Sequence, residues 1–197
     1  YLRALGLMPQ GAPERLAVHD ALEAIYRYLG RRRERRVHLL AMRKLARETR
    51  NARWVATAVM RTARLELDEG VLARALPIAQ KAVELARASR SPTLEVEALT
   101  LLSEILRDLG DTQGAITASE RALAVCDAGR LAARVRGEVL RTKGILLRYV
   151  GRVEEAVDAY IEALAMFRGV GARRQEARVL VSLAFARFVS EQFEDVI

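Results

Sequence analysis

The stretch from residue 144 to residue 167, GILLRYVGRVEEAVDAYIEALAMF, decides the fold class. The small residue Gly144 is followed seven positions later by Gly151, and alanines follow that glycine after five and twelve positions, at Ala156 and Ala163. Apolar residues after Gly151 recur at spacings of three and four, which predicts a half-buried helix, whereas a strand would show strict alternation. The stretch is therefore interpreted as two helices packed closely across a glycine turn.

The same turn recurs along the chain at a nearly constant interval. Successive turn positions are 40, 40, 41 and 40 residues apart, and four of the five carry glycine. They are Gly30, Gly70, Gly110, Gly151 and Glu191. Because one helix pair cannot bury its apolar stripe alone, this period predicts stacked units that form a solenoid.

Composition supports an all-α fold organised as one array. The chain is rich in Ala, Leu, Arg and Glu and contains only 5% aromatic residues and 4 prolines, a composition that favours helices over strands. Residues 1–12, which contain two glycines and one proline, are expected to be an entering segment before an array over residues 13–197. Pro77 falls inside a predicted helix and is expected to bend it without ending it.

Over residues 13–197 the pattern resembles the tetratricopeptide repeat (TPR). The usual TPR period is about 34 residues, so the longer period of this chain resembles a long-period bacterial form of the family. The resemblance implies a right-handed α-α superhelix, a TPR-like solenoid of antiparallel helix pairs. It also implies a module for protein-protein interaction, scaffolding and regulation in a multidomain bacterial signalling protein. Such arrays often follow a serine/threonine kinase or a nucleotide-switch ATPase domain.

The C-terminal residues predict an incomplete last unit. Residues 193–197 align with residues 153–157, the opening of a second helix. We therefore expect a fragment truncated at the C-terminus, whose open apolar end could join a second copy in a homo-oligomer. The sequence has a single cysteine, no signal peptide and no long apolar run, which favours a cytoplasmic protein without a membrane span.

The positive charge is concentrated in residues 31–53. This segment holds ten basic and two acidic residues, so it accounts for the whole net charge of +8. Four of its arginines are predicted to share one helix face at spacings of 7, 4 and 3, opposite a buried apolar stripe. The arginines are Arg36, Arg43, Arg47 and Arg50, and the stripe is Val37, Leu40, Ala41 and Leu45.

Two interpretations of this basic face remain open. It could bind an acidic partner, such as an acidic protein domain, nucleic acid or anionic lipid, or it could be the solvated side of an outer helix. Nucleic acid is less favoured than protein, because few aromatic residues lie between the arginines. The unit after Gly30 is also unusual, since Arg35 and Met42 stand where the other units have alanine or another apolar residue.

In the resembled family, ligands bind a groove lined by the first helix of each unit. Transferring that register predicts a peptide groove that includes Arg64, Glu104, Arg107, Arg141, Ile145, Arg148, Tyr149, Phe185 and Phe188. Its arginines could bind carboxylates of a protein or peptide partner, and its aromatic residues could anchor an apolar side chain. Alternatively, the arginines pair with neighbouring glutamates such as Glu138, and Phe185 and Phe188 pack against a following repeat.

No catalytic, cofactor or metal site is predicted, and the fragment is interpreted as non-enzymatic. His19 and His38 are the only histidines and have no Cys or carboxylate at metal-ligand spacing, so they are expected to be surface or packing residues. Cys126 aligns with the inner stripe of the other second helices and is expected to be a buried thiol.

Overall fold

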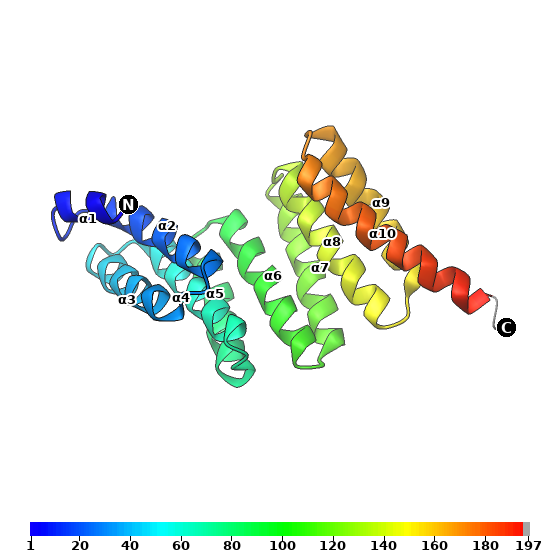
Figure 1. The fold of residues 1–197 in the computed structure, drawn as a ribbon, viewed down its shortest axis with the longest axis horizontal. Helices are drawn as coiled ribbons and strands as arrows, with labels where there is room; N and C mark the ends of the chain where they lie inside the picture. Colours follow the sequence, from blue (N-terminus) through cyan, green and yellow to red (C-terminus); the bar gives the residue numbers. More distant parts are fainter. Residues whose placement is uncertain (195–197) are drawn as a thin grey trace. The chain divides into compact units, whose positions relative to one another are not determined.

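The computed structural model describes the backbone of residues 1–194 and the side chains of residues 1–189. Within residues 1–194 all regular structure is α-helical, as the sequence predicts (Figure 1). The helices are α1 (Leu2–Leu7), α2 (Arg15–Tyr28), α3 (Arg32–Glu48), α4 (Ala52–Asp68), α5 (Leu72–Ala88), α6 (Pro92–Asp108), α7 (Thr112–Ala128), α8 (Ala133–Tyr149), α9 (Val153–Gly169) and α10 (Arg173–Glu194).

The chain forms two compact units, Tyr1–Leu94 and Glu95–Ile197. In the first unit α2 packs on α3, α3 on α4 and α4 on α5. In the second unit α7 packs on α8, α8 on α9 and α9 on α10. Helices that follow one another in the sequence therefore pack together within each unit, as in a TPR-like fold.

Each helix from α2 to α9 is followed, two positions after its last residue, by one residue in the left-handed backbone region. At the end of α3, Arg50 has a φ of 49°. Its N–H donates to Arg47 O at 3.0 Å, and the N–H of Asn51 donates to Ala46 O at 3.0 Å. This Schellman motif satisfies carbonyl groups that the helix end would leave unpaired. The left-handed residues are Gly30, Arg50, Gly70, Arg90, Gly110, Arg130, Gly151 and Gly171.

The two ends of the described chain add detail to the expected pattern. The predicted entering segment contains α1, and Arg15 fixes the last turn of this helix: its guanidinium donates to Leu5 O at 2.7 Å and to Met8 O at 2.9 Å. The turn expected at Glu191 is not seen, because α10 runs through this position to Glu194. Pro77 lies inside α5, which continues to Ala88 as predicted.

Small residues allow close contact between helices in the second unit. Ser103 of α6 donates its hydroxyl to Ala115 O of α7 at 2.9 Å. A Cβ at Gly144 would lie 2.6 Å from the Tyr160 ring, so only glycine leaves room for this ring, which is fully buried. Cys126 is 2% exposed, which confirms the predicted buried thiol. The repeated small positions therefore serve helix packing.

The first helix pair carries a buried ion pair where other pairs have small residues. Glu23 stands seven positions before Gly30, and Arg35 stands five after it. The Arg35 side chain is 3% exposed and that of Glu23 is 1% exposed; Arg35 Nε donates to Glu23 Oε1 at 2.9 Å. A second guanidinium nitrogen of Arg35 lies 2.9 Å from Asp68 Oδ2 of α4. The deviant Arg35 therefore links three helices of the first unit.

Candidate functional site

The structure separates the four arginines of the predicted basic face. Arg36 is paired with Glu69 and lies 4.0 Å from Glu66, both in or next to α4. Arg50 lies in the turn after α3 with a positive φ, so it does not continue the helical face. Arg43 and Arg47 form no ion pair with the described residues. These two arginines are the members of the predicted face that lie on α3 itself and have no ion pair among the described residues.

The apolar stripe predicted for α3 is partly wrong. Leu45 is buried, but Val37 is 62% exposed, Leu40 is 63% exposed and Ala41 is half-buried. The buried apolar positions of α3 are instead Leu39, Met42, Leu45 and Ala46. The helix is rotated relative to the prediction because Arg35 is buried by its two carboxylate partners, and Leu40 therefore lies on the same side as the free arginines.

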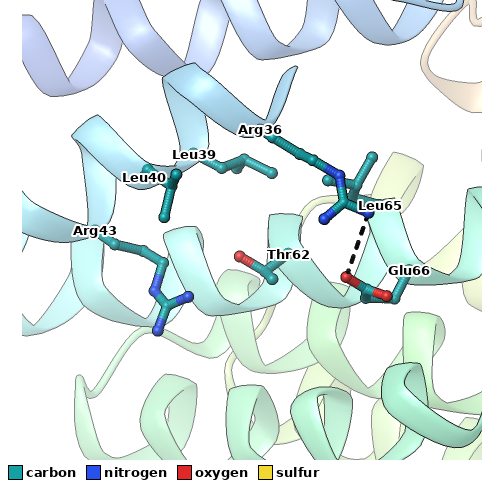
Figure 2. A pocket seen from close by; sticks show the side chains of 7 residues that line it. All are labelled: Arg36, Leu39, Leu40, Arg43, Thr62, Leu65 and Glu66. Carbon is teal, nitrogen blue, oxygen red and sulfur yellow. Dashed lines mark ion pairs between the residues drawn. The ribbon is translucent and has the colours of Figure 1, made fainter. Parts of the chain in front are cut away.

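Two hollows lie along this side of the first unit. The smaller hollow, of about 180 Å³, is lined by residues of α3 and α4. Figure 2 shows Arg36 directed at Glu66, with which it pairs, whereas Arg43 lies apart from that carboxylate. The lining residues of the smaller hollow are Arg36, Leu39, Leu40, Arg43, Thr62, Leu65 and Glu66.

The larger hollow, of about 490 Å³, lies beside the smaller one and shares Arg43 and Thr62 with it. Its volume is in the range of about 300–1,000 Å³ typical of ligand sites. Residues of α3, α4 and α5 line it: Arg43, Arg47, Val55, Val59, Thr62, Pro77, Ile78, Lys81 and Leu85. The pattern of basic residues pointed to α3, but the apolar residues of α4 and α5 were not predicted to belong to this site.

The predicted peptide groove is divided between the two units. Arg64 belongs to the first unit, and the other eight predicted residues belong to the second. Arg64, Glu104 and Ile145 are half-buried. Arg107 Nη2 lies 2.7 Å from Asp108 Oδ1, so the neighbouring residue already supplies a carboxylate to this arginine.

Arginines of α8 and α10 share one carboxylate in the second unit. Arg141 Nε lies 3.0 Å from Glu138 Oε2, and Arg178 Nη1 lies 3.4 Å from Glu138 Oε1. This is the alternative in which groove arginines pair with neighbouring glutamates. Arg141 is therefore less available to a ligand carboxylate than its sequence position suggested.

Arg148 differs from these arginines because its neighbours are aromatic. Its guanidinium carbon lies 4.7 Å from the ring centre of Phe185 and 5.4 Å from that of Tyr149. No carboxylate of the described residues forms an ion pair with it. Phe185 is 51% exposed, Phe188 is 55% exposed and Val181 is 71% exposed. We call the set Arg148, Tyr149, Val181, Phe185 and Phe188 the aromatic-arginine surface.

The two histidines meet in the core of the first unit. His19 Nδ1 of α2 lies 3.0 Å from His38 Nδ1 of α3, and Tyr26 stacks on the His38 ring with centroids 5.4 Å apart. Burial, the neighbouring His38 and Arg15 lower the pKa of His19 to about 4. Burial also lowers the pKa of His38. Both are packing residues, and their proximity could not be read from their separation in the sequence.

Neither a metal centre nor a membrane span is found in the part of the chain that the structure describes. Within it, no group of three or more His, Cys, Asp or Glu side chains is placed to hold a metal ion. None of its helices combines the length and the apolar character needed to cross a membrane.

Comparison with solved structures identifies the fold as TPR-like. No family model and no curated protein matches the sequence. Among solved structures, the chain is similar to aspartyl phosphate phosphatase F from Bacillus subtilis, with a TM-score of 0.81 and 14% identity over 91% of this chain and 46% of that one.

Two further structures have the same likeness. One is a signal transduction ATPase with numerous domains and a tetratricopeptide repeat sensor, from Pyrococcus horikoshii, with a TM-score of 0.75 and 14% identity over 93% of this chain and 28% of that one. The other is a Rap protein complexed with competence and sporulation factor, with a TM-score of 0.75 and 13% identity over 92% of this chain and 55% of that one. The chain thus spans only part of each of these proteins, and the likeness shows a TPR-like fold.

Proposed function

We propose that the chain is a protein-interaction array that binds a peptide segment of a partner through the aromatic-arginine surface. The observation that carries the proposal is the position of Arg148 beside exposed aromatic rings and without an acidic partner among the described residues. Tyrosine and arginine are among the residue types that most often dominate the binding energy of protein interfaces, and phenylalanine is enriched at such interfaces. The Rap protein, which has a similar fold, was solved in complex with a factor.

The chemistry of the surface defines the peptide that it would accept. Val181, Phe185 and Phe188 are four and three positions apart on α10, so they share one helix face and offer an apolar contact. The Arg148 guanidinium beside them offers a bidentate partner for a carboxylate. We therefore expect a peptide that carries an apolar residue next to Asp, Glu or a C-terminal carboxylate.

A sensory role in a larger regulatory protein is the second part of this proposal. It is supported by the similar fold of the ATPase with a tetratricopeptide repeat sensor. In such a protein, peptide binding to the array would regulate an effector domain, such as a kinase or a nucleotide-switch ATPase, and the array itself would carry no catalytic residue.

Peptide selection tests the binding surface. A random displayed peptide library is selected on the 197-residue chain, and the enriched peptides are measured by calorimetry. Exchange of Arg148 to Gln together with Phe185 to Ser is expected to weaken binding at least about tenfold, because both substitutions remove contacts of the hot-spot type. The matched control combines Arg174→Gln and Ile161→Ser, an exposed arginine and an exposed apolar residue outside the surface.

Two results would contradict this assignment. One is an unchanged affinity of the enriched peptides for the Arg148 and Phe185 variant. The other is self-association of the chain in light scattering that disappears in the same variant, because the surface would then join two copies of the chain.

A further inference from the structure

We propose a second binding site, in which the larger hollow between α3, α4 and α5 receives the apolar side of an acidic amphipathic helix from a partner protein. The site is separate from the peptide groove predicted on α4. Thr62 lines the hollow, whereas Arg64 is the predicted groove residue. Two positions along a helix differ by about 200° in direction, so the two residues project to nearly opposite sides of α4.

The cations at this hollow explain why the partner must be acidic. Arg43 and Arg47 are one helical turn apart on α3 and form no ion pair with the described residues. Lys81 of α5 contributes a third cation and lies 2.7 Å from Glu84. The first unit as a whole has 19 basic and 9 acidic residues, a net charge of +10. Acidic side chains of a partner would therefore meet free guanidinium groups and a favourable surrounding field.

The aliphatic side chains at the bottom of the hollow, here called its floor, explain why one side of the partner helix must be apolar. Val55 and Val59 of α4 and Ile78 and Leu85 of α5 are half-buried and line the hollow. An amphipathic helix places apolar residues at spacings of three and four on one face and charged residues beside them. Such a helix could place its apolar residues on this floor and its carboxylates at Arg43 and Arg47, which is the helix-in-groove mode of recognition.

The same features disfavour membrane and nucleic acid as the occupant. The aliphatic side chains that line the larger hollow are half-buried, whereas insertion into a bilayer needs apolar residues that project from the surface. The exposed Leu40 lines the smaller hollow and is a single projecting residue there. The hollow has no aromatic lining residue on which a base could stack. Phosphate groups would gain nothing from the aliphatic floor, although they could contact the arginines.

The test is a selection from a displayed library of 16-residue helical peptides with randomised surface positions, performed on the 197-residue chain. Enriched peptides are expected to carry apolar residues at i, i+3 or i+4, and i+7, flanked by Asp or Glu. Their binding should shift the methyl resonances of Val55, Val59 and Ile78. Exchange of both Arg43 and Arg47 to Gln should weaken these peptides at least about tenfold, because two charged contacts are lost.

The matched control exchanges Arg32 and Arg33 to Gln. These arginines are exposed, belong to the same helix and form no ion pair with the described residues, but they do not line the hollow. This variant loses the same charge and should keep its affinity within about twofold, because surface charges away from a contact act only through the long-range field. Thermal unfolding followed by circular dichroism establishes that both variants fold.

Three outcomes would overturn the proposal. In the first, enriched peptides bind the Arg43 and Arg47 variant as well as the unaltered chain. In the second, no enriched peptide shifts the methyl resonances of the hollow. In the third, these substitutions abolish binding to phosphatidylserine vesicles or to duplex DNA while no peptide depends on them, which would assign the arginines to a lipid or nucleic-acid contact.

Discussion

Removal of the buried arginine of α3 should destabilise the first unit severely. In an Arg35→Ala variant, Glu23 would stay buried at 1% side-chain exposure without its partner. A buried ion pair that loses one partner costs about 3–5 kcal/mol, because an uncompensated charge remains in the core. This is a large part of the total of about 5–15 kcal/mol that stabilises a typical domain. The first unit of this variant should therefore be largely unfolded or marginally stable.

The double variant distinguishes a charge effect from a loss of packing. Removing Glu23 as well as Arg35 eliminates both charges and places alanine at both positions, as in Ala63 and Ala75 of the next helix pair, which are fully buried. The double variant should thus be at least about 2 kcal/mol more stable than the sum of the single changes implies. Strictly additive costs would mean that the pair contributes only packing.

The assay can report on the first unit alone. Trp54 is the only tryptophan and packs against the core cluster that contains Leu39 and Met42. Urea unfolding followed by its fluorescence therefore measures the free energy of unfolding of this unit, while circular dichroism follows the whole chain. Arg31→Ala is the control, because Arg31 is exposed and 3.8 Å from Glu34, and it should cost less than about 1 kcal/mol. A cost below about 1 kcal/mol for Arg35→Ala would refute the reasoning.

Three further predictions concern pH, packing and backbone strain. The folded pKa values of His19 and His38 are lowered from 6.5, to about 4 for His19, so the unfolded chain binds more protons below pH 6.5 and stability should fall as the pH drops from 6.5 toward 4. Tryptophan-detected urea midpoints should show this slope, and His19→Gln should reduce it between pH 5 and 6.5. A Gly144→Ala exchange would crowd the Tyr160 ring and should cost about 1–3 kcal/mol in chemical unfolding; a neutral result would mean that the ring moves easily. Arg130 has a φ of 46°, so Arg130→Gly should stabilise the second unit by about 0.5–1 kcal/mol, seen as a higher melting temperature; a lower one would exclude backbone strain at this turn.

The sequence predicted the glycine turns correctly, because the backbone after a helix often needs a left-handed residue and glycine adopts this conformation most easily. Glycine at positions 30, 70, 110 and 151 is suited to a left-handed residue after a helix, and each of these glycines has a positive φ. The prediction of a turn at Glu191 was wrong. It rested only on the period of about 40 residues, and glutamate has no preference for a turn of this kind. Arg50, Arg90 and Arg130 show the converse case, since their conformation follows from the helix ends and not from a preference of arginine.

The candidate sites were harder to predict because they depend on pairs of residues far apart in the sequence. Arg35 stands out in the repeat pattern but its partner Glu23 does not, and without that partner a buried arginine is unfavourable. The buried face of α3 includes Arg35, and Leu40 therefore lies on the exposed side of the helix. The prediction of a buried apolar stripe through Leu40 is wrong for this reason. The larger hollow is lined by three helices, so basic spacing along α3 could indicate its charge but not its aliphatic floor.

The Glu23–Arg35 pair also has a consequence for how similar repeats find their proper neighbours during folding. A chain of near-equivalent helices can dock one repeat out of step, since each helix offers much the same apolar face. If α3 docked on α4 in the place of α5, Arg35 would lie against Ala63 and have no carboxylate at the position of Glu23. Loss of the Glu23 carboxylate would disfavour that arrangement, because a buried charge is tolerated only when it is well paired. The pair therefore discriminates against misassembly at the first helix pair of the array.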